Sequence, residues 1–363
     1  MRYTFKEIAF NSTEKRIPLE EDRITYIGLE HLDSRKLTIT RYGSDVPLKG
    51  EKLVMRKGDV LFGKRNTYLK RVAIAPFDGL FSAHGMVLRP NEEIIAKDYF
   101  PFFLSSDYFL NEAIRISVGS LSPTVNWKDL KELEFEIPDK DRQHELAGLL
   151  SAANDLKESY EAMIKATDEM VKSQFISQFG SSSQCSKEEL KKNVDEMFIG
   201  PFGSSLKNDC FVEKEDGYCV VYEQKHAIEK RNDLPFRYVS QKKYQELKRF
   251  EVLPGDIIVS CRGTIGEVYR IPEDSPRGIM HPSIMKIRLK KESYCSEYFV
   301  FAVSEYMKER ESMNLGTGVK MAVTATDMGK ELFAKPSISD QMGFISIIHQ
   351  ADKSKQIVYF RPN

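Results

Sequence analysis

The sequence predicts an α+β protein in which two β-rich domains form a pseudo-two-fold repeat and are joined by long coiled-coil helices. Three observations support this fold class. Landmark residues recur about 198 positions apart along the 363-residue chain. Gly-Asp turns precede short apolar strands in both halves, and each half ends in a segment with helical periodicity.

The repeat is carried by landmarks that occur in the same order in both halves, at offsets of 197 to 199 residues. They are Gly58-Asp59 with Gly255-Asp256, Tyr99-Phe100 with Tyr298-Phe299, Gly119 with Gly316, and Asp129, Pro138 and Gln143 with Asp327, Pro336 and Gln341. This period is too long for a solenoid, so it describes two copies of one domain, each with a trailing helix. Chance matching of common dipeptides is the alternative, and the shared order argues against it.

The length of the chain favours about two domains, and the repeat sets their boundaries. We expect a first β-rich domain over residues 1–138 and a long spacer helix over residues 139–181. A second β-rich domain is expected over residues 182–337, followed by a shortened C-terminal helix over residues 338–363.

The first trailing helix carries an apolar seam spaced by three and four residues, which is typical of a coiled coil. The seam residues expected to pack on a partner helix are Leu146, Leu149, Leu156 and Met163. After Met170 the stripe drifts to Val171, Phe175 and Phe179, which indicates a stutter. A helix of about 38 residues rises almost 60 Å, so a compact domain alone cannot cover it.

The second trailing helix offers the partner. It places Phe344, Ile347, Ile348, Ala351 and Val358 on one face, and Ile347 is expected to pack against the first helix. Antiparallel pairing of the two helices would hold the domains a fixed distance apart. In the alternative arrangement, each helix packs only on its own domain.

Composition narrows the function classes. Lys plus Arg equals Asp plus Glu at 54 each, so a polyanion-binding surface requires local clustering of charge. The five cysteines are widely spaced without a Cys-x-x-Cys pair, which argues against a metal site or a disulfide framework. We see neither an apolar signal segment nor a run long enough to cross a bilayer, so we expect a cytoplasmic protein with no membrane partner.

Positive charge is concentrated in one stretch of the first domain. The 20 residues from Lys52 to Arg71 contain seven Lys or Arg and a single acid, Asp59. Because Lys and Arg neutralise phosphates while Arg and Asn also bind base edges, the loop between the two flanking strands is a candidate DNA-binding surface. Its candidate residues are Lys64, Arg65, Asn66, Tyr68, Lys70 and Arg71. The alternative is a solvated hairpin tip.

Weaker candidates for DNA contact lie elsewhere in the two halves. The corresponding loop of the second half contributes Ser260, Arg262 and Thr264. A Gly-Ser loop, whose hydroxyls and amides can approach a phosphate, contributes Ser120, and the corresponding loop of the second half contributes Lys320. A third loop, at the start of the second half, contributes Ser204 and Lys207. His84 and His281 are 197 residues apart and are expected at equivalent positions, with a structural or ligand-contact role.

Signatures of catalysis are weak or missing from the sequence. We find no phosphate-binding loop of Walker type and no Asn/Asp-Pro-Pro-aromatic motif of amino-methyltransferases. Pro138-Asp139 lacks the acidic-x-lysine that follows in nuclease motifs and is better explained as a helix start. The remaining alternatives are a stand-alone DNA nuclease or methyltransferase, and a protein-interaction scaffold without a DNA role.

With these features together, the chain resembles the specificity subunit of type I restriction–modification systems. The stretches that carry the resemblance lie at residues 24–33, 57–90 and 119–130 in the first half, and at residues 199–207 and 253–266 in the second. The resemblance implies a non-catalytic subunit for host defence and DNA modification. In it, two target recognition domains each bind one half of a bipartite site in double-stranded DNA, and a helical spacer sets the gap.

The resemblance also implies partners. Methyltransferase subunits, which carry S-adenosylmethionine, are expected to dock on the helices, and restriction subunits that use ATP and Mg²⁺ are expected to join through them. No cofactor and no catalytic residue are expected in this chain. It departs from the family pattern in its second helix, which is much shorter than the first.

Overall fold

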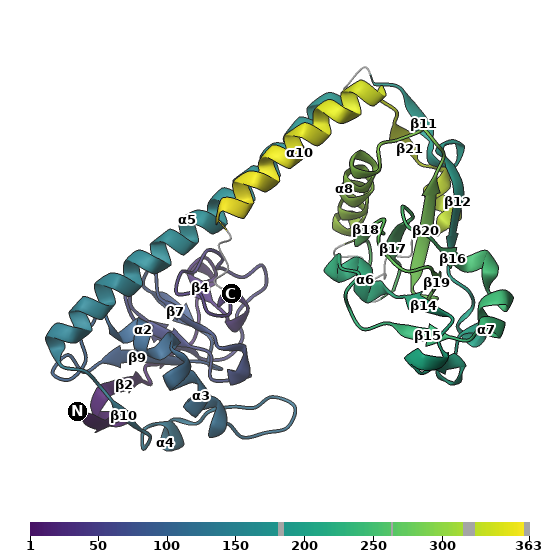
Figure 1. Ribbon diagram of the computed structural model, residues 1–363. Helices are drawn as coiled ribbons and strands as arrows, with labels where there is room; N and C mark the ends of the chain where they lie inside the picture. The colour runs from purple at the N-terminus through teal and green to yellow at the C-terminus, as the bar shows by residue number, and fades with distance from the viewer. Residues whose placement is uncertain (181–184, 263, 315–323, 359–363) are drawn as a thin grey trace. The chain divides into compact units, whose positions relative to one another are not determined.

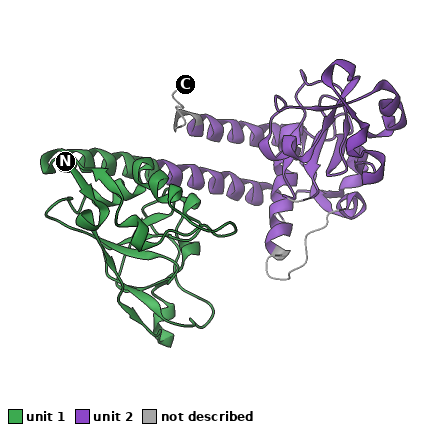
Figure 2. Ribbon diagram, turned by 90° about the horizontal axis from the view of Figure 1, so that it is seen from below, with its two compact units in different colours: residues 1–159 green, residues 160–363 purple. Residues whose placement is uncertain are grey.

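The computed structural model describes residues 1–180, 185–262, 264–314 and 324–358 of the chain (Figure 1). The chain divides into two compact units, Met1–Ser159 and Tyr160–Asn363. The longest helix, α5 (Lys140–Phe179), contributes its first part to one unit and its second part to the other (Figure 2). A long uninterrupted helix is thus present where the sequence predicts one.

Two four-stranded sheets form the frame of the first unit. The antiparallel sheet has the order β2 (Ala9–Ser12), β9 (Met86–Pro90), β6 (Val60–Phe62), β7 (Val72–Ile74). The other has the order β3 (Lys15–Arg16), β5 (Lys52–Met55), β8 (Gly79–Phe81), β4 (Tyr26–Ile27), with β4 parallel to β8. Apolar residues of β6 and β9 point to both faces, which explains why these strands read as continuous apolar runs.

Helices and a terminal strand pair close the core of the first unit. The elements are α1 (Phe5–Ile8), α2 (Phe100–Ser105), α3 (Asp107–Arg115), α4 (Trp127–Leu130), and the pair β1 (Arg2–Thr4) and β10 (Glu134–Glu136). Phe109 of α3 lies at the centre of the core, with its ring 5.1 Å from that of Phe5 and 5.7 Å from that of Phe62. Burial of these rings holds α3 against the antiparallel sheet.

The second unit repeats this frame. Its antiparallel sheet has the order β12 (Val194–Ile199), β20 (Ile284–Leu289), β17 (Ile257–Ser260), β18 (Val268–Arg270). Its other sheet has the order β13 (Phe211–Val212), β15 (Arg237–Val239), β14 (Cys219–Tyr222), β19 (Gly278–Met280), β16 (Glu251–Val252). The remaining elements are the pair β11 (Lys187–Glu189) and β21 (Leu332–Ala334) and the helices α6 (Gln224–Glu229), α7 (Gln241–Glu246), α8 (Ser296–Asn314), α9 (Ala325–Lys330) and α10 (Ile338–Val358).

The ladders that the two units share pair equivalent residues, which confirms the predicted repeat, while β3 beside β5 and β15 and β13 beside β14 are particular to one unit each. Met55 pairs with Gly79 in the first unit, and Val252 pairs with Gly278 in the second. Both units also contain one parallel pair, β4 with β8 and β14 with β19. The offset between equivalent residues is 197 at Met55 but 199 at Gly79, because the connection between the two positions is longer in the second unit.

The Gly-Asp turn is built identically in the two units. Gly58 and Gly255 adopt positive φ angles of 90° and 88°, which favour glycine. The following Asp59 accepts a hydrogen bond from the backbone N–H of Arg56 and is held by both Arg89 Nε at 2.7 Å and Arg89 Nη2 at 2.8 Å. The aspartate therefore ties the turn before β6 to β9, the neighbouring strand of the same sheet.

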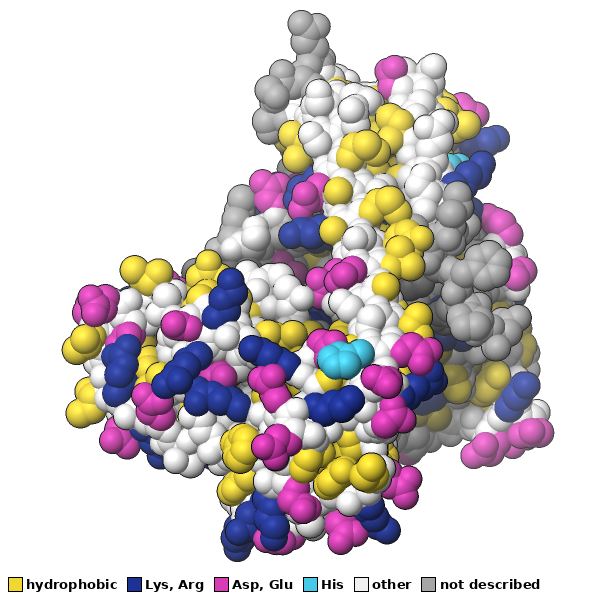
Figure 3. Space-filling model, turned by 90° about the vertical axis from the view of Figure 1, so that its left-hand side faces the viewer, with side chains coloured by type: hydrophobic (Ala, Val, Ile, Leu, Met, Phe, Trp, Pro, Cys, Tyr) yellow, Lys and Arg dark blue, Asp and Glu magenta, His cyan; other side chains and the backbone are white. Residues whose placement is uncertain are grey.

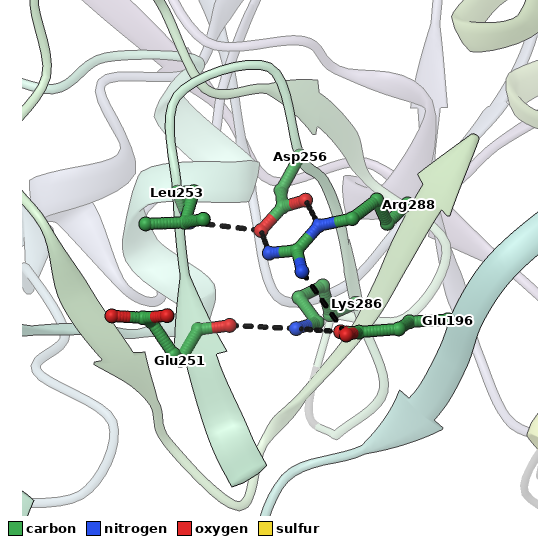
Figure 4. A network of polar contacts seen from close by, with 6 residues as sticks. All are labelled: Glu196, Glu251, Leu253, Asp256, Lys286 and Arg288. Carbon is green, nitrogen blue, oxygen red and sulfur yellow. Dashed lines mark hydrogen bonds and ion pairs between the residues drawn. The ribbon is translucent and has the colours of Figure 1, made fainter. Parts of the chain in front are cut away.

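The equivalent turn of the second unit carries a larger polar network (Figure 4). Asp256 accepts from Leu253 N–H and from Arg288, whose Nη1 also lies 3.1 Å from Glu196. The side chain of Lys286 is only 1% exposed, and its ammonium donates to Glu196 and to the Glu251 carbonyl. The first unit has Val87 at the position of Lys286, so the buried cation distinguishes the two frames.

A buried glutamine fixes the start of each trailing helix. Gln143 accepts from the N–H of Ala96 at 2.6 Å and donates to the Pro138 carbonyl at 2.8 Å. Gln341 repeats both bonds, accepting from Cys295 N–H at 2.7 Å and donating to the Pro336 carbonyl at 3.0 Å. Each trailing helix is thereby anchored to the unit that precedes it in sequence.

Within the second unit, α10 runs antiparallel to the end of α5. The Phe175 ring lies 5.4 Å from that of Phe344 near the start of α10, and Asp168 pairs with Lys355 near its end at 2.5 Å. The predicted antiparallel pairing is confirmed over this stretch, and Ile347 packs on the same core. The stripe of α5 that packs here contains the buried Val171 and Phe179 and the partly buried Phe175.

Most of the heptad seam of α5 is exposed. The expectation that these residues pack on α10 is therefore wrong for this part of the helix. Leu149, Leu156 and Met163 are exposed among the described residues, and Leu146 is half-buried. Hydrophobic side chains accordingly lie exposed along α5 (Figure 3). The physical reason is length: α10 has 21 residues against 40 in α5, too few to pair along all of it.

Candidate nucleic-acid interface

The basic segment of the first unit is paired with the Gly-Ser loop. After β6 the chain runs alongside the segment that precedes α4, with Asn66 N–H donating to the Pro123 carbonyl at 2.7 Å and Val125 N–H to the Lys64 carbonyl at 3.0 Å. Arg65 forms a bridge with Thr124 between these bonds. Two segments that the sequence indicates separately as candidates for DNA contact therefore form one surface.

The side chains of this surface differ in their exposure to solvent and in their contacts within the unit. Arg65 is exposed, and its Nη2 lies 3.4 Å from Ser122 Oγ. Tyr68 is exposed on the short 3₁₀ helix Thr67–Leu69. Lys64 is half-buried, and burial lowers the pKa of its ammonium, with a smaller contribution from the nearby Lys15. Asn66 has a positive φ of 55°, which lets the chain turn between the two contacts.

Lys70 and Arg71 have partners within the unit. Lys70 Nζ lies 2.5 Å from Asp107 and donates to Asn111 Oδ1 at 3.0 Å. The hydrogen bonds from Lys70 and Arg35 lower the pKa of the Asp107 carboxyl. Arg71 donates to the Leu29 carbonyl at 2.6 Å. Both cations thus hold the loop in place, and phosphate contact by either stays a prediction.

The Gly-Ser loop is a closed turn with an exposed tip. Val118 and Thr124 exchange two backbone hydrogen bonds, of 3.1 and 2.9 Å, across its base. Gly119 has a positive φ of 112°, which sends the chain outward. Ser120 at the tip is exposed, as expected for a polar contact, and Leu121 beside it is 94% exposed.

The two histidines are not equivalent, so this expectation is wrong. Ser82 N–H donates to the Ile27 carbonyl, whereas in the second unit His281 N–H donates to the Tyr222 carbonyl. His281 therefore matches Ser82, and His84 is shifted by two positions because the offset is 199 in these strands. His84 is exposed in the loop before β9.

In the second unit, three loops meet at the end of the antiparallel sheet. Gly200 N–H donates to the Ile284 carbonyl at 2.9 Å, and Cys261 N–H donates to the Ser283 carbonyl at 2.8 Å. His281 Nδ1 lies 2.7 Å from Ser283 Oγ. Burial lowers the pKa of His281, which favours its neutral form.

The candidates of the second unit divide by exposure. Arg262, Thr264, Ser204 and Lys207 are exposed. Ser260 is fully buried in β17, and its Oγ accepts from Glu267 N–H at 3.0 Å, so we do not include it in the proposed surface. Lys320 lies outside the described residues.

Sequence reasoning missed two apolar residues on these surfaces. Leu121 is the most exposed large hydrophobic residue described in the first unit, and Phe202, at 86% exposure, is the most exposed in the second. Both stand in flagged loops, in "GSLSP" and "GPFGSS". The available signal was a large apolar residue set among glycine, serine and proline.

The described part of the chain offers no metal centre or membrane span. It contains no group of three or more His, Cys, Asp or Glu side chains arranged to hold a metal ion. None of the described helices is both long and apolar enough to cross a bilayer. The exposed surfaces above are instead rich in donors suited to a polyanion.

Comparisons with known proteins agree with this picture. Residues 13–166 match the family model described as the type I restriction modification DNA specificity domain. A putative type I restriction enzyme MjaX specificity subunit from Methanocaldococcus jannaschii is 23% identical over 339 residues, covering 88% of this chain and 79% of that protein. The type I restriction enzyme EcoDI specificity subunit from Escherichia coli is 25% identical over 144 residues, covering 39% of this chain and 32% of that protein.

Two solved structures share the fold. A chain from a structure of a type I R-M system aligns over 99% of this chain and 91% of its own length, with a TM-score of 0.55 and 17% identity. The S subunit of a type I restriction-modification system from M. genitalium aligns over 98% and 90%, with a TM-score of 0.52 and 13% identity. These likenesses extend over both units.

Proposed function

We propose a DNA-binding scheme for this chain, which belongs to the specificity subunits of type I restriction–modification systems. As such a subunit, it is a non-catalytic, DNA-binding component of a multi-subunit enzyme. In the scheme, each unit binds one half of a bipartite target, and α5 sets the spacer between the halves. The target recognition domains would comprise residues 1–138 and 182–337, with the helical segments 139–181 and 338–363 between and after them.

One observation carries the scheme. In the first unit, Arg65 is presented on a surface made of two hydrogen-bonded segments, flanked by serine hydroxyls and Tyr68. A guanidinium matches the O6 and N7 acceptors of guanine, hydroxyls and amides suit phosphates, and tyrosine stacks or contacts the backbone. In the second unit, Arg262 and Thr264 stand on the equivalent strand connection, so the same frame presents different side chains.

We assign the exposed seam of α5 to partner binding. Leu149, Leu156 and Met163 present apolar surface that α10 leaves uncovered. We propose that methyltransferase subunits dock here, and that restriction subunits join through them. S-adenosylmethionine, ATP and Mg²⁺ would then act on the partners rather than on this chain. The complex would work on cytoplasmic DNA.

Paired substitutions test the division between the two units. Arg65→Ala should relax specificity in one half-site and Arg262→Ala in the other, because one bidentate contact to guanine contributes about 1–3 kcal/mol of discrimination. The measurement is methylation mapping of genomic DNA in a host that carries each variant with its methyltransferase partner. Relaxation of both halves by either variant would refute the scheme.

The isolated chain provides a further check. Cleavage or methyl transfer by the purified subunit without partners would favour the alternative, a stand-alone nuclease or methyltransferase. A protein scaffold without a DNA role would show no gel shift at low salt. A DNA-binding subunit should instead lose affinity steeply as salt rises, since phosphate contacts release counterions.

A further inference from the structure

The starting point is the most exposed apolar side chain of the first unit. Leu121 stands at the tip of the loop between α3 and α4, which extends from the unit in Figure 1. With 94% of its surface exposed, it contributes almost nothing to the apolar core. An apolar group held in water suggests a contact made only with a partner.

Hydrogen bonds hold the backbone on both sides of this side chain in one turn. Its base is closed by the two backbone bonds between Val118 and Thr124, and Asn66 N–H binds the Pro123 carbonyl on the adjoining segment. The Thr124 hydroxyl also donates to the Ser122 carbonyl. Five main-chain positions, 119–123, are thus spanned by a closed ladder, so the leucine is presented by a preorganised turn.

The surroundings of Leu121 are polar. Ser120 and Ser122 flank it in sequence, and the Arg65 guanidinium lies 3.4 Å from the Ser122 hydroxyl. A protein that docks through a leucine normally surrounds it with further apolar surface, whereas hydroxyls and a cation suit sugar and phosphate. Apolar side chains with such neighbours are used by DNA-binding proteins as wedges between base pairs.

The second unit places an apolar residue in a similar setting on another loop. Phe202 is 86% exposed in the turn after β12, beside the short 3₁₀ helix Gly203–Ser205. The backbone of this turn is tied to the start of β20, where Gly200 N–H donates to the Ile284 carbonyl. Cys261 N–H, next to Arg262, donates to the carbonyl of the preceding residue, Ser283. These bonds place the turn that carries Phe202 next to the loop that carries Arg262.

We infer that Leu121, and Phe202 in the other unit, insert between neighbouring base pairs of their half-sites when the complex binds DNA. The inference rests on the proposed function, which supplies the DNA and the register. It adds a second source of specificity, because pyrimidine–purine steps unstack more readily than others. Each half-site should then prefer such a step at a position that no polar side chain contacts.

The test uses the complete complex with its methyltransferase partner and the duplex found by methylation mapping. Leu121→Ser should weaken binding to the intact duplex about tenfold, while Leu121→Phe retains it. On a duplex in which a mismatch already weakens stacking at the wedge step, Leu121→Ser should bind within about twofold of the wild type. A 2-aminopurine probe at that step should brighten with the wild type and not with Leu121→Ser.

Controls separate the possible failures. Leu19→Ser replaces another exposed leucine of the first unit and should leave binding unchanged. Phe202→Ser should act on the other half-site alone. If Leu121→Ser binds the intact duplex like the wild type, or loses equal affinity on both duplexes, the wedge is refuted. Loss of the methyltransferase from the variant complex would also refute it, because the leucine would then contact protein. If the wild-type complex recognises no bipartite site, the proposed function itself fails.

Discussion

Removing the carboxylate of the Gly-Asp turn should destabilise one unit at a time. Asp59→Asn keeps the shape of the side chain but removes the charge that faces Arg89, with which it forms two hydrogen bonds. Breaking a buried ion pair costs about 3–5 kcal/mol. Because the Arg89 side chain is 31% exposed, water replaces part of the lost contact, and we expect a loss of about 2 kcal/mol.

The second unit should lose more. Arg288 is 29% exposed, but without Asp256 it keeps only Glu196, which it shares with the buried Lys286. Two cations would then compete for one carboxylate. We expect about 3 kcal/mol for Asp256→Asn, since hydrogen bonds to charged groups contribute about 1.5–3 kcal/mol each.

Urea denaturation distinguishes the two variants. The chain has one tryptophan, Trp127, whose ring lies 5.7 Å from that of Phe5 in the core of the first unit. Its fluorescence reports that unit, and Asp59→Asn should lower the midpoint by about 1 M urea at an m-value near 2 kcal/mol/M. Asp256→Asn should leave this trace unchanged and shift only the part of the far-ultraviolet circular dichroism transition that comes from the second unit.

A matched control removes a carboxylate from an exposed turn. Asp78 accepts from Lys57 N–H at 2.7 Å at an exposed position, so Asp78→Asn should cost about 0.5 kcal/mol or less. The reasoning is refuted if Asp59→Asn shifts the Trp127 midpoint no more than Asp78→Asn does. It is also refuted if Asp256→Asn shifts that midpoint as much as Asp59→Asn.

Two further predictions concern the second unit. Phe344→Ala should lower the free energy of unfolding of the second unit by about 3–5 kcal/mol, because the ring packs between α5 and α8 with no exposed surface. Met342→Ala, at an exposed position, should change this free energy little. Urea titration followed by circular dichroism measures both variants. Burial raises the pKa of the Cys219 and Cys261 thiols to about 11, so their alkylation by iodoacetamide should be slow at pH 8 and rise about tenfold per pH unit up to pH 10. Mass spectrometry of the labelled peptides measures this, and labelling at pH 8 as fast as in the urea-unfolded chain would contradict the assigned burial.

Residues whose role is local could be found from sequence. Asp59 and Asp256 each follow a glycine at positive φ and close a turn with a short hydrogen-bond-accepting side chain. Because few residue types can do this, the two Gly-Asp pairs indicate the repeat and the strands that follow them. Gln143 and Gln341 likewise recur because each must satisfy the same backbone groups at a helix start. Such constraints act through a few neighbouring residues and leave a pattern at fixed spacing.

Features that depend on distant pairing could not be predicted. The hydrogen bonds between the Lys64–Asn66 segment and the loop before α4 join residues 57 and 61 positions apart, and the sequence of neither segment indicates the pairing. The mistaken equivalence of His84 and His281 arose because loops of different length shift the offset from 197 to 199 between strands. The burial of Ser260 follows from the tertiary packing of β17, which periodicity alone does not show.

The two segments that form the exposed surface of the first unit are joined to each other by main-chain hydrogen bonds. The bonds between Asn66 and Pro123, Lys64 and Val125, and across the base of the loop all join backbone N–H and carbonyl groups. Every residue supplies the carbonyl, and every residue other than proline also supplies the N–H. Under the proposed function, point mutations at the exposed positions would therefore change the target one side chain at a time without removing these backbone bonds. The residues that maintain the fold would then be different from those that determine the target. Such an architecture would let the target change in evolution, as foreign DNA changes, while the fold is kept.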